Sequence, residues 1–418
     1  MRELKDSGVE WIGVIPTHWK ISAMKHIGRY INGYAFKPED WGNSGLQIIR
    51  IQDLTGSNDK PNYYNGTIDS RYHIYPGDIL ISWAATLDAF DWCKGEGWLN
   101  QHIFKAIPNN NLITKRFFLQ LVKVAMRNMN NDNKHGIVMQ HVTTDVFNNF
   151  RVPLPSLSEQ QRIADFLDRK CADIDNILEK TRSSIEEYKK LKLSVITEAV
   201  TKGVRGPRPM KDSGIEWIGL YPEDWTLTKV KWLLNERNER SEDGSEEPLS
   251  MSQKYGLIPT KDMDTIPNMA SSFVGAKITH VGDLVFNKLK AHLGVFAVSK
   301  YEGLVSPDYA VYYKTARADM RYLEYLFKTP QYILEFRKRS SGVGAGLTRL
   351  YTGDLFAMYS ASPSLEEQQE IAAYLDKKCA EIDSLIASKE KFIAKLESYK
   401  KSLIYEYVTG KKEVPSNA

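Results

Sequence analysis

Residues 5–13 read Lys-Asp-Ser-Gly-Val-Glu-Trp-Ile-Gly, and residues 211–219 read Lys-Asp-Ser-Gly-Ile-Glu-Trp-Ile-Gly. Pro16 and Trp19 recur as Pro222 and Trp225 at the same displacement of 206 positions. A stretch of this length, identical but for one residue, does not recur by chance. The chain is therefore an internal repeat, and the repeat decides how the rest is interpreted.

The repeat extends over almost the whole chain, but its middle has diverged. Residues 158–164 match 366–372, and Cys-Ala-Asp-Ile-Asp from Cys171 matches Cys-Ala-Glu-Ile-Asp from Cys379, both at a displacement of 208. Between these ends the inserts 20–150 and 226–360 share only traces, such as a Gly-Asp pair before an apolar run. A repeated framework with two unlike inserts suggests the same kind of recognition applied to two different targets. An old duplication followed by drift is the alternative.

The last part of each copy predicts a long helix with a coiled-coil seam. Apolar residues recur there at spacings of mostly three and four, after prolines that end the preceding segment and possible caps at Ser158 and Ser364. The seam positions are Leu167, Ile174, Leu178, Ile185, Tyr188, Leu375, Ile382, Ile386, Ile393 and Leu396.

Helices of this length, about 60 Å, are too long for the interior of a small domain. Because the apolar residues of each seam must be buried, we expect the two helices to pack antiparallel about a pseudo-two-fold axis, centred near Glu179 and Ala387. Cys171 and Cys379 then lie on the order of 20 Å apart and serve core packing. Two roles are open for the Glu-Gln-Gln sequences that begin the helices: packing within the chain or contact with other subunits.

The predicted fold class is α+β. Two globular mixed α/β domains are held apart by two long antiparallel coiled-coil helices, with an internal pseudo-two-fold repeat. The predicted divisions are the first domain with its repeat motif, the first helix, the second motif and domain, the second helix and a tail, at 1–157, 158–202, 203–364, 365–410 and 411–418.

Composition sets wide limits on function. The 418 residues are 42% hydrophobic and carry a net charge of only +4, so the net charge alone does not indicate nucleic-acid binding. No apolar run long enough for a bilayer and no secretory signal are visible, which predicts a cytoplasmic protein without a membrane partner. The three cysteines include no CxxC pair, so neither a disulfide framework nor a zinc site is expected.

The modest positive excess sits in the inserts. Residues 20–150 carry 14 Lys and Arg against 11 Asp and Glu, and residues 226–360 carry 18 against 15. Each insert has strand-like runs, such as 48–51 and 78–82, and one amphipathic helix near its end, at about 115–128 or 319–339.

Two kinds of segment in the inserts are candidates for contact with DNA. The first is the polar, glycine-bearing loop after each amphipathic helix, and the second, with a weaker signal, follows the Gly-Asp strand at 83–91 and 287–294. Arg and Lys reach guanine edges, Gln pairs with adenine, and glycine allows close approach of the backbone. The ordinary alternative is a solvated helix end and turn. The predicted DNA-binding residues are Arg50, Lys134, His135, Gln140, His141, Lys288, Lys290, His292, Arg337, Lys338, Arg339 and Arg349.

The chain resembles the DNA-specificity subunits of type I restriction–modification enzymes. The resemblance rests on the Asp-Ser-Gly-x-Glu-Trp-Ile-Gly opening with its following Pro and Trp, and on Pro-x-Pro-x-Leu-x-Glu-Gln-Gln-x-Ile-Ala at 153–164, of which the copy ending at Ala372 keeps one proline. It implies two target-recognition domains, each reading half of a bipartite site in double-stranded DNA, with the helices as a ruler. It also implies two methylase subunits, which bind S-adenosylmethionine and modify adenine, and motor-nuclease restriction subunits. No recognition residue is carried over by motif.

The sequence contains no motif for catalysis of its own. An adenine methylase needs an Asn/Asp-Pro-Pro-aromatic motif, and a translocase needs GxxxxGK[ST]; neither occurs. We therefore expect a non-catalytic chain with no cofactor and no metal. The alternatives are a coiled-coil protein-interaction scaffold without DNA binding, and a stand-alone modification enzyme, which would bind S-adenosylmethionine in isolation.

Overall fold

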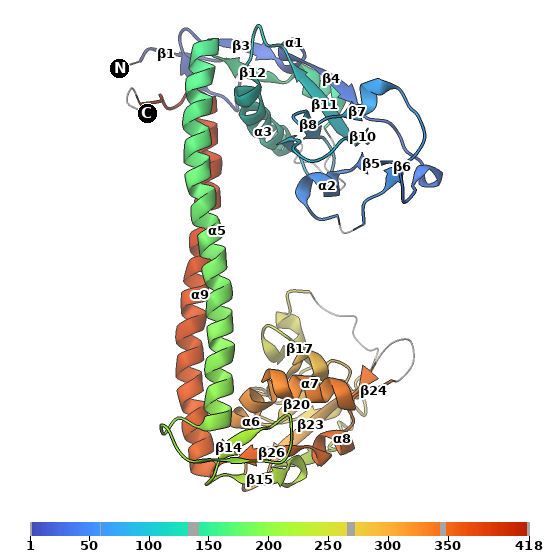
Figure 1. Cartoon of the computed structure of the whole chain (residues 1–418), viewed down its shortest axis with the longest axis vertical. Coiled ribbons are helices and arrows are strands. Elements are labelled where there is room, and N and C mark those ends of the chain that lie inside the picture. Colours follow the sequence, from blue (N-terminus) through green and yellow to red (C-terminus); the bar gives the residue numbers. More distant parts are fainter. Residues whose placement is uncertain (1, 59, 133–141, 266–271, 343–347, 416–418) are drawn as a thin grey trace. The chain divides into compact units, whose positions relative to one another are not determined.

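The computed structural model describes residues 2–58, 60–132, 142–265, 272–342 and 348–415. Its contacts divide the chain into a first unit, Met1–Thr181 with Lys391–Ala418, and a second unit, Arg182–Glu390. Each unit contains a mixed α/β domain and part of both long helices, α5 (Leu157–Lys202) and α9 (Leu365–Val408) (Figure 1). The predicted fold class, with long helices and two mixed domains, is confirmed.

The repeated opening motif folds into the same hairpin in both units. In the first, β1 (Leu4–Asp6) pairs with β2 (Val14–Pro16), and in the second β13 (Met210–Asp212) pairs with β14 (Leu220–Pro222). The Asp carboxylate accepts the N–H of the first motif glycine, and both glycines of each copy have φ between 64° and 67°. This left-handed conformation favours glycine, which explains why both copies of the motif have glycine at these two positions.

A four-stranded antiparallel sheet forms the centre of the first domain. Its order is β4 (Gly28–Asn32), β11 (Ile103–Pro108), β8 (Ile79–Ser82) and β9 (Asp88–Asp91). Successive side chains of a strand point to opposite faces. Ile79 and Ile81 therefore join the core that contains α3 (Lys115–Asp132), whereas Leu80 packs with the second sheet of the domain. That sheet has the order β6 (Tyr63–Tyr64), β5 (Leu46–Ile49), β10 (Gly97–Leu99) and β7 (His73–Ile74).

The second domain repeats this arrangement with different residues. Its sheet has the order β16 (Leu234–Arg237), β23 (Tyr309–Lys314), β20 (Leu284–Asn287) and β21 (Phe296–Val298). Leu284 and Phe286 pack in the core with the helices, and Val285 packs in a separate small core. Smaller pairs complete it: β17 (Leu249–Ser252) with β18 (Gly256–Pro259), β19 (Lys277–Thr279) with β22 (Gly303–Val305), and β24 (Ser341–Gly342) with β25 (Thr348–Arg349).

Each insert begins and ends on neighbouring strands. In the first unit β3 (Lys20–Ala23) pairs antiparallel with β12 (Arg151–Leu154), and in the second β15 (Thr226–Lys229) pairs with β26 (Tyr359–Ser362). The two ends of an insert therefore leave the repeated framework side by side. Short helices lie within the inserts: α1 (Met24–Ile27), α2 (Ile51–Thr55), α4 (Thr144–Asn149) and α8 (Thr352–Ala357).

Two of the predicted elements in the inserts are wrong in detail. The single helix expected over 319–339 is two helices, α6 (Met320–Phe327) and α7 (Pro330–Arg339), because Pro330 lacks an N–H and therefore starts a helix instead of continuing one. The strand expected over 48–51 ends at Ile49, and Ile51 begins α2, whose first turn is held by a hydrogen bond from the Arg50 N–H to Asp53.

Within each unit the segments of α5 and α9 pack antiparallel, but not in the predicted register. A pairing centred near Glu179 and Ala387 would place Lys400 opposite Phe166. In the first unit the Phe166 ring instead contacts the Tyr407 ring, with ring centroids 4.6 Å apart, and Lys400 Nζ lies 2.6 Å from Asp175 Oδ1. The predicted register is therefore wrong by about one heptad, because the alternating spacing is satisfied equally well by a shift of seven residues.

The predicted seam residues point inward to different extents. Leu167, Ile174, Leu178, Ile185, Leu375 and Ile382 are buried, and Tyr188, Ile386, Ile393 and Leu396 are half-buried. Cys171 and Cys379 are buried free thiols, each in the core of its own unit, and burial raises their pKa values. In the described part of the chain no helix combines the length and the hydropathy needed to span a bilayer.

The Glu-Gln-Gln sequences face both inward and outward. The first glutamine of each copy, Gln160 or Gln368, is almost completely buried and bonds to three backbone groups of its own unit, whereas Gln161 and Gln369 are exposed. Trp19 and Trp225 donate to the preceding glutamate in their units. Packing within the chain therefore explains the first glutamine and the glutamate.

The helix caps are partly as predicted. Ser364 Oγ accepts the Glu367 N–H at the start of α9. In α5 the equivalent residue is Ser156, whose Oγ accepts the Glu159 N–H, so the cap assigned to Ser158 is wrong. The reason is that α5 begins one residue earlier than predicted, at Leu157.

Candidate nucleic-acid interface

In both units the residue that follows the candidate loop is hydrogen-bonded to the segment after the Gly-Asp strand. The N–H of Val142 donates to the carbonyl of Trp83 at 3.1 Å, and the N–H of Leu350 donates to the carbonyl of Lys288 at 3.0 Å. Trp83 and Lys288 each follow the last residue of the central strand, β8 or β20. The chain after each candidate loop therefore returns to an equivalent position beside the segment that follows the Gly-Asp strand. We call this position the return point; it contains Trp83 and Val142 in the first domain and Lys288 and Leu350 in the second.

The Gly-Asp pair holds the start of that strand in the same way in both copies. Gly77 and Gly282 have φ of 95° and 92°, and Asp78 and Asp283 accept an N–H from three residues earlier. The same turn therefore precedes the strand in both domains. Because the backbone turn is shared, Trp83 and Lys288 occupy equivalent positions with different side chains.

Four of the predicted contacts, Lys134, His135, Gln140 and His141, lie outside the described residues. Arg50 is the N-cap residue of α2, and its guanidinium lies over the Trp41 ring at 5.2 Å. Arg50 directly follows β5, which belongs to the second sheet of the first domain, and it is not part of the return point at Trp83.

The end of α7 presents less free charge than its sequence suggests. The buried Glu335 lies 2.9 Å from Lys338 Nζ and 3.4 Å from Arg339 Nε. Arg337 is exposed, and no carboxylate of the described chain lies within ion-pair distance of it. Of the three predicted cations, Arg337 is therefore the one available to a phosphate.

The short helix η5 (Ala291–Leu293) packs beside α7 and carries two further candidates. Lys290 is its exposed N-cap residue, and His292 is half-buried. His292 Nδ1 is buried and has no hydrogen-bond partner within the described residues.

Lys288 and Arg349, far apart in the sequence, belong to one cluster of charges. Arg349 Nη2 lies 2.7 Å from Asp308 Oδ1. Burial lowers the pKa of Lys288, and the positive charges of Lys277 and Arg349 lower it further. Lys277, on β19, is almost completely buried, with its Nζ 3.6 Å from Glu236 Oε1. The sequence carries no signal for Lys277, because only the sheet brings β19 to this position.

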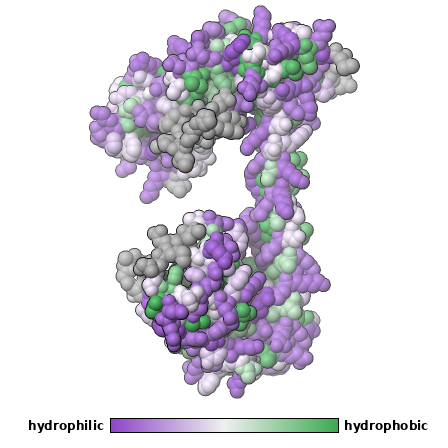
Figure 2. Space-filling model, turned by 180° about the vertical axis from the view of Figure 1, so that it is seen from behind, coloured by the Kyte–Doolittle hydropathy of each residue, from purple (hydrophilic) through white to green (hydrophobic). Residues whose placement is uncertain are grey.

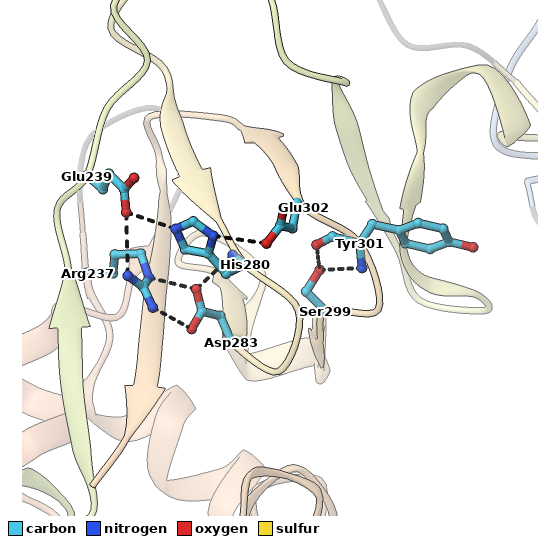
Figure 3. Close-up of polar contacts among 7 residues, drawn as sticks. All are labelled: Arg237, Glu239, His280, Asp283, Ser299, Tyr301 and Glu302. Atoms are coloured by element: carbon cyan, nitrogen blue, oxygen red, sulfur yellow. Dashed lines mark hydrogen bonds and ion pairs between the residues drawn. The ribbon is translucent and has the colours of Figure 1, made fainter.

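A second polar cluster of this domain lies around His280 (Figure 3). Its ring bonds to Glu239 at 2.9 Å and contacts Glu302 at 3.4 Å, so it links the segments after β16 and before β22. Arg237 and Asp283 form a bidentate ion pair beside it, at 2.7 and 3.1 Å. The bond to Glu239 raises the pKa of His280, and burial and Arg237 oppose this.

We expect this cluster to make the stability of the second domain depend on pH. Because the folded pKa of His280 is raised, its contribution is complete below the unfolded value of about 6.5 and is lost as pH rises through the folded value. Glu239, whose pKa His280 lowers, contributes above about pH 4.3 and is lost on acidification. Thermal unfolding at pH 5.5 and 8.5 should therefore show a larger decrease in Tm for the wild type than for His280→Gln. The exposed His26→Gln provides the control, and equal decreases in wild type and His280→Gln would contradict the expectation.

Comparisons with known proteins find similarity to one family. Residues 16–187 match the family model of the type I restriction modification DNA specificity domain. The type I restriction enzyme EcoBI specificity subunit of Escherichia coli is 24% identical over 98% of this chain and 89% of its own length. The MjaVIII specificity subunit of Methanocaldococcus jannaschii is 25% identical over 80% of this chain and 79% of its own length.

The fold has a counterpart among solved structures. A chain solved in work on the complex assembly and conformational transition of the type I R-M system has a TM-score of 0.67. It covers 95% of this chain and 99% of its own length at 16% identity, so the likeness concerns the fold alone. The repeated hairpins and helices agree with the family model over residues 16–187 and with the full-length relatives, and the chain is therefore similar to the specificity subunits of type I restriction–modification systems.

Proposed function

We propose that each mixed α/β domain of this chain reads one half of a bipartite site in double-stranded DNA. The observation that carries the proposal is the shared return point: the same backbone hydrogen bond holds Trp83 in one domain and Lys288 in the other. Trp83 packs against the core of its unit, whereas Lys288 is a half-buried cation, so the two domains present different chemistry at equivalent places. One framework with different side chains at its contact segments is what two unlike half-sites require.

The contacts follow from the position and charge of the candidates. The proposed DNA-binding residues remain Arg50, Lys134, His135, Gln140, His141, Lys288, Lys290, His292, Arg337, Lys338, Arg339 and Arg349. Exposed Arg337 and Lys290 are assigned to phosphates, because an exposed cation gains affinity without sequence discrimination.

The long helices are proposed to set the unread gap and to bind two methylase subunits. Several large apolar side chains of these helices are exposed outside the seam, including Leu191, Leu385, Phe392 and Tyr399. Patches of hydrophobic residues interrupt the hydrophilic surface of the helices in Figure 2. Where such side chains form a contiguous apolar patch, the patch is typical of a surface that another protein covers.

The chemistry is proposed to belong to partner subunits. The methylase subunits would bind S-adenosylmethionine and modify adenine, and motor-nuclease subunits would join for cleavage. This chain then contributes binding and positioning, as a non-catalytic subunit without a cofactor of its own.

The proposal is tested by mapping methylated adenines in the genomic DNA of cells that express the neighbouring methylase subunit with and without this chain. We expect a split motif, two short sequences separated by an unread gap, only when the chain is present. If both proteins are folded and associated and no chain-dependent motif appears, the protein is a scaffold and not a DNA reader.

A further inference from the structure

The charge cluster at the return point of the second domain contains more cations than carboxylates. Lys277, Lys288 and Arg349 are accompanied by Glu236 and Asp308. Glu236 forms an ion pair with Lys277, and Asp308 forms an ion pair with one nitrogen of Arg349. Within the described residues no carboxylate lies within 4.0 Å of the Lys288 ammonium, which is half-buried and therefore poorly compensated by water.

Arg349 is held in place but only partly satisfied. Its Nη2 is bound to Asp308, and its guanidinium lies over the Tyr351 ring at 6.0 Å. Its Nε is buried without a hydrogen-bond partner among the described residues. A guanidinium fixed by a carboxylate and a ring has lost most of its conformational freedom before any ligand arrives, which favours directional recognition.

The backbone segments that carry the two cations are joined to each other. The hydrogen bond between the Leu350 N–H and the Lys288 carbonyl joins the residue after Arg349 to the segment of Lys288. The ligand that suits this pair is electron-rich and offers adjacent acceptors. In the major groove only guanine presents two acceptors, O6 and N7, on one base edge.

We infer that Lys288 and Arg349 read a guanine in the half-site of the second domain. This inference rests on the proposed function and adds the base to it. A phosphate also accepts hydrogen bonds, but an exposed and mobile cation suffices for a phosphate, whereas these two side chains are half-buried and one is fixed by Asp308. In the first domain the equivalent place holds Trp83, so no such guanine contact is expected there.

The experiment measures competition binding by the complex of this chain with its methylase subunit. The competitors are the mapped site and variants in which each base pair of either half is replaced in turn. The proteins are wild type, Arg349→Gln, Arg349→Lys and Lys288→Gln. The exposed Lys300→Gln, from the same domain, is the matched control, and thermal unfolding checks the fold of each variant.

For Arg349→Gln and Lys288→Gln we expect the preference for guanine at one position of the second half-site to decrease about 10- to 100-fold, the range of a good bidentate contact. Arg349→Lys, which keeps the charge but loses the fork, should also lose the preference. An even decrease at all positions, rescued by Arg349→Lys, would identify a phosphate contact and overturn the inference. Unchanged discrimination in folded variants would overturn it as well. If wild type itself binds no split site, the proposed function fails instead.

Discussion

Replacing Gln160 by leucine should lower the free energy of unfolding of the first unit by about 3 kcal/mol, because the completely buried Gln160 amide satisfies three buried or partly buried backbone groups. Gln160 Oε1 accepts the Thr114 N–H at 2.8 Å, and its Nε2 donates to the carbonyls of Leu112 and Pro155 at 2.9 Å. Leucine fills a similar volume but makes none of these bonds, and a buried unsatisfied group costs about 1–3 kcal/mol. Chemical denaturation measures the loss.

The neighbouring glutamine is the matched control. Gln161 is exposed and, among the described residues, its side chain bonds to the Asp165 carboxylate, so Gln161→Leu should change stability by less than about 0.5 kcal/mol. The second unit repeats the design, with Gln368→Leu as the damaging change and Gln369→Leu as its control. Equal effects of Gln160→Leu and Gln161→Leu on the free energy of unfolding would show that the hydrogen bonds of Gln160 do not stabilise the start of α5.

Exchanging one insert for that of another specificity subunit should change one half of the methylated motif completely and leave the other half unaltered. The junctions suit this exchange, because Ala23 lies opposite Arg151 and Lys229 lies opposite Tyr359 on paired strands. Replacing residues 24–150 or 230–358 therefore leaves the framework strands intact. Methylation mapping of cells that express each chimera with the methylase subunit gives the result.

The exchange should preserve the ion pairs between an arginine of the insert and the aspartates of the long helix. Arg116, in the first insert, binds Asp165 and Asp168 on α5, and Arg321, in the second, binds Asp376 on α9. A donor insert with an arginine at this place is the appropriate choice. A change in both halves of the motif after a single exchange would contradict independent reading by the two domains.

The sequence by itself determined the duplicated architecture. The opening motif specifies its hairpin through local contacts, such as Asp6 accepting the Gly8 N–H, and the long helices follow from apolar spacing along one segment. Such features depend on residues close together in the chain, and therefore a repeat in sequence becomes a repeat in structure.

Only the tertiary structure decided how distant segments meet. The heptad pattern allowed several registers, and the contact between the rings of Phe166 and Tyr407 belongs to one of them. Gln160 is polar in the sequence, yet it is buried because backbone groups of another segment need its amide. The candidate site likewise depends on Lys277, Lys288 and Arg349 meeting across strands, where burial and neighbouring charge change the chemistry of each side chain in ways that its position in the sequence does not reveal.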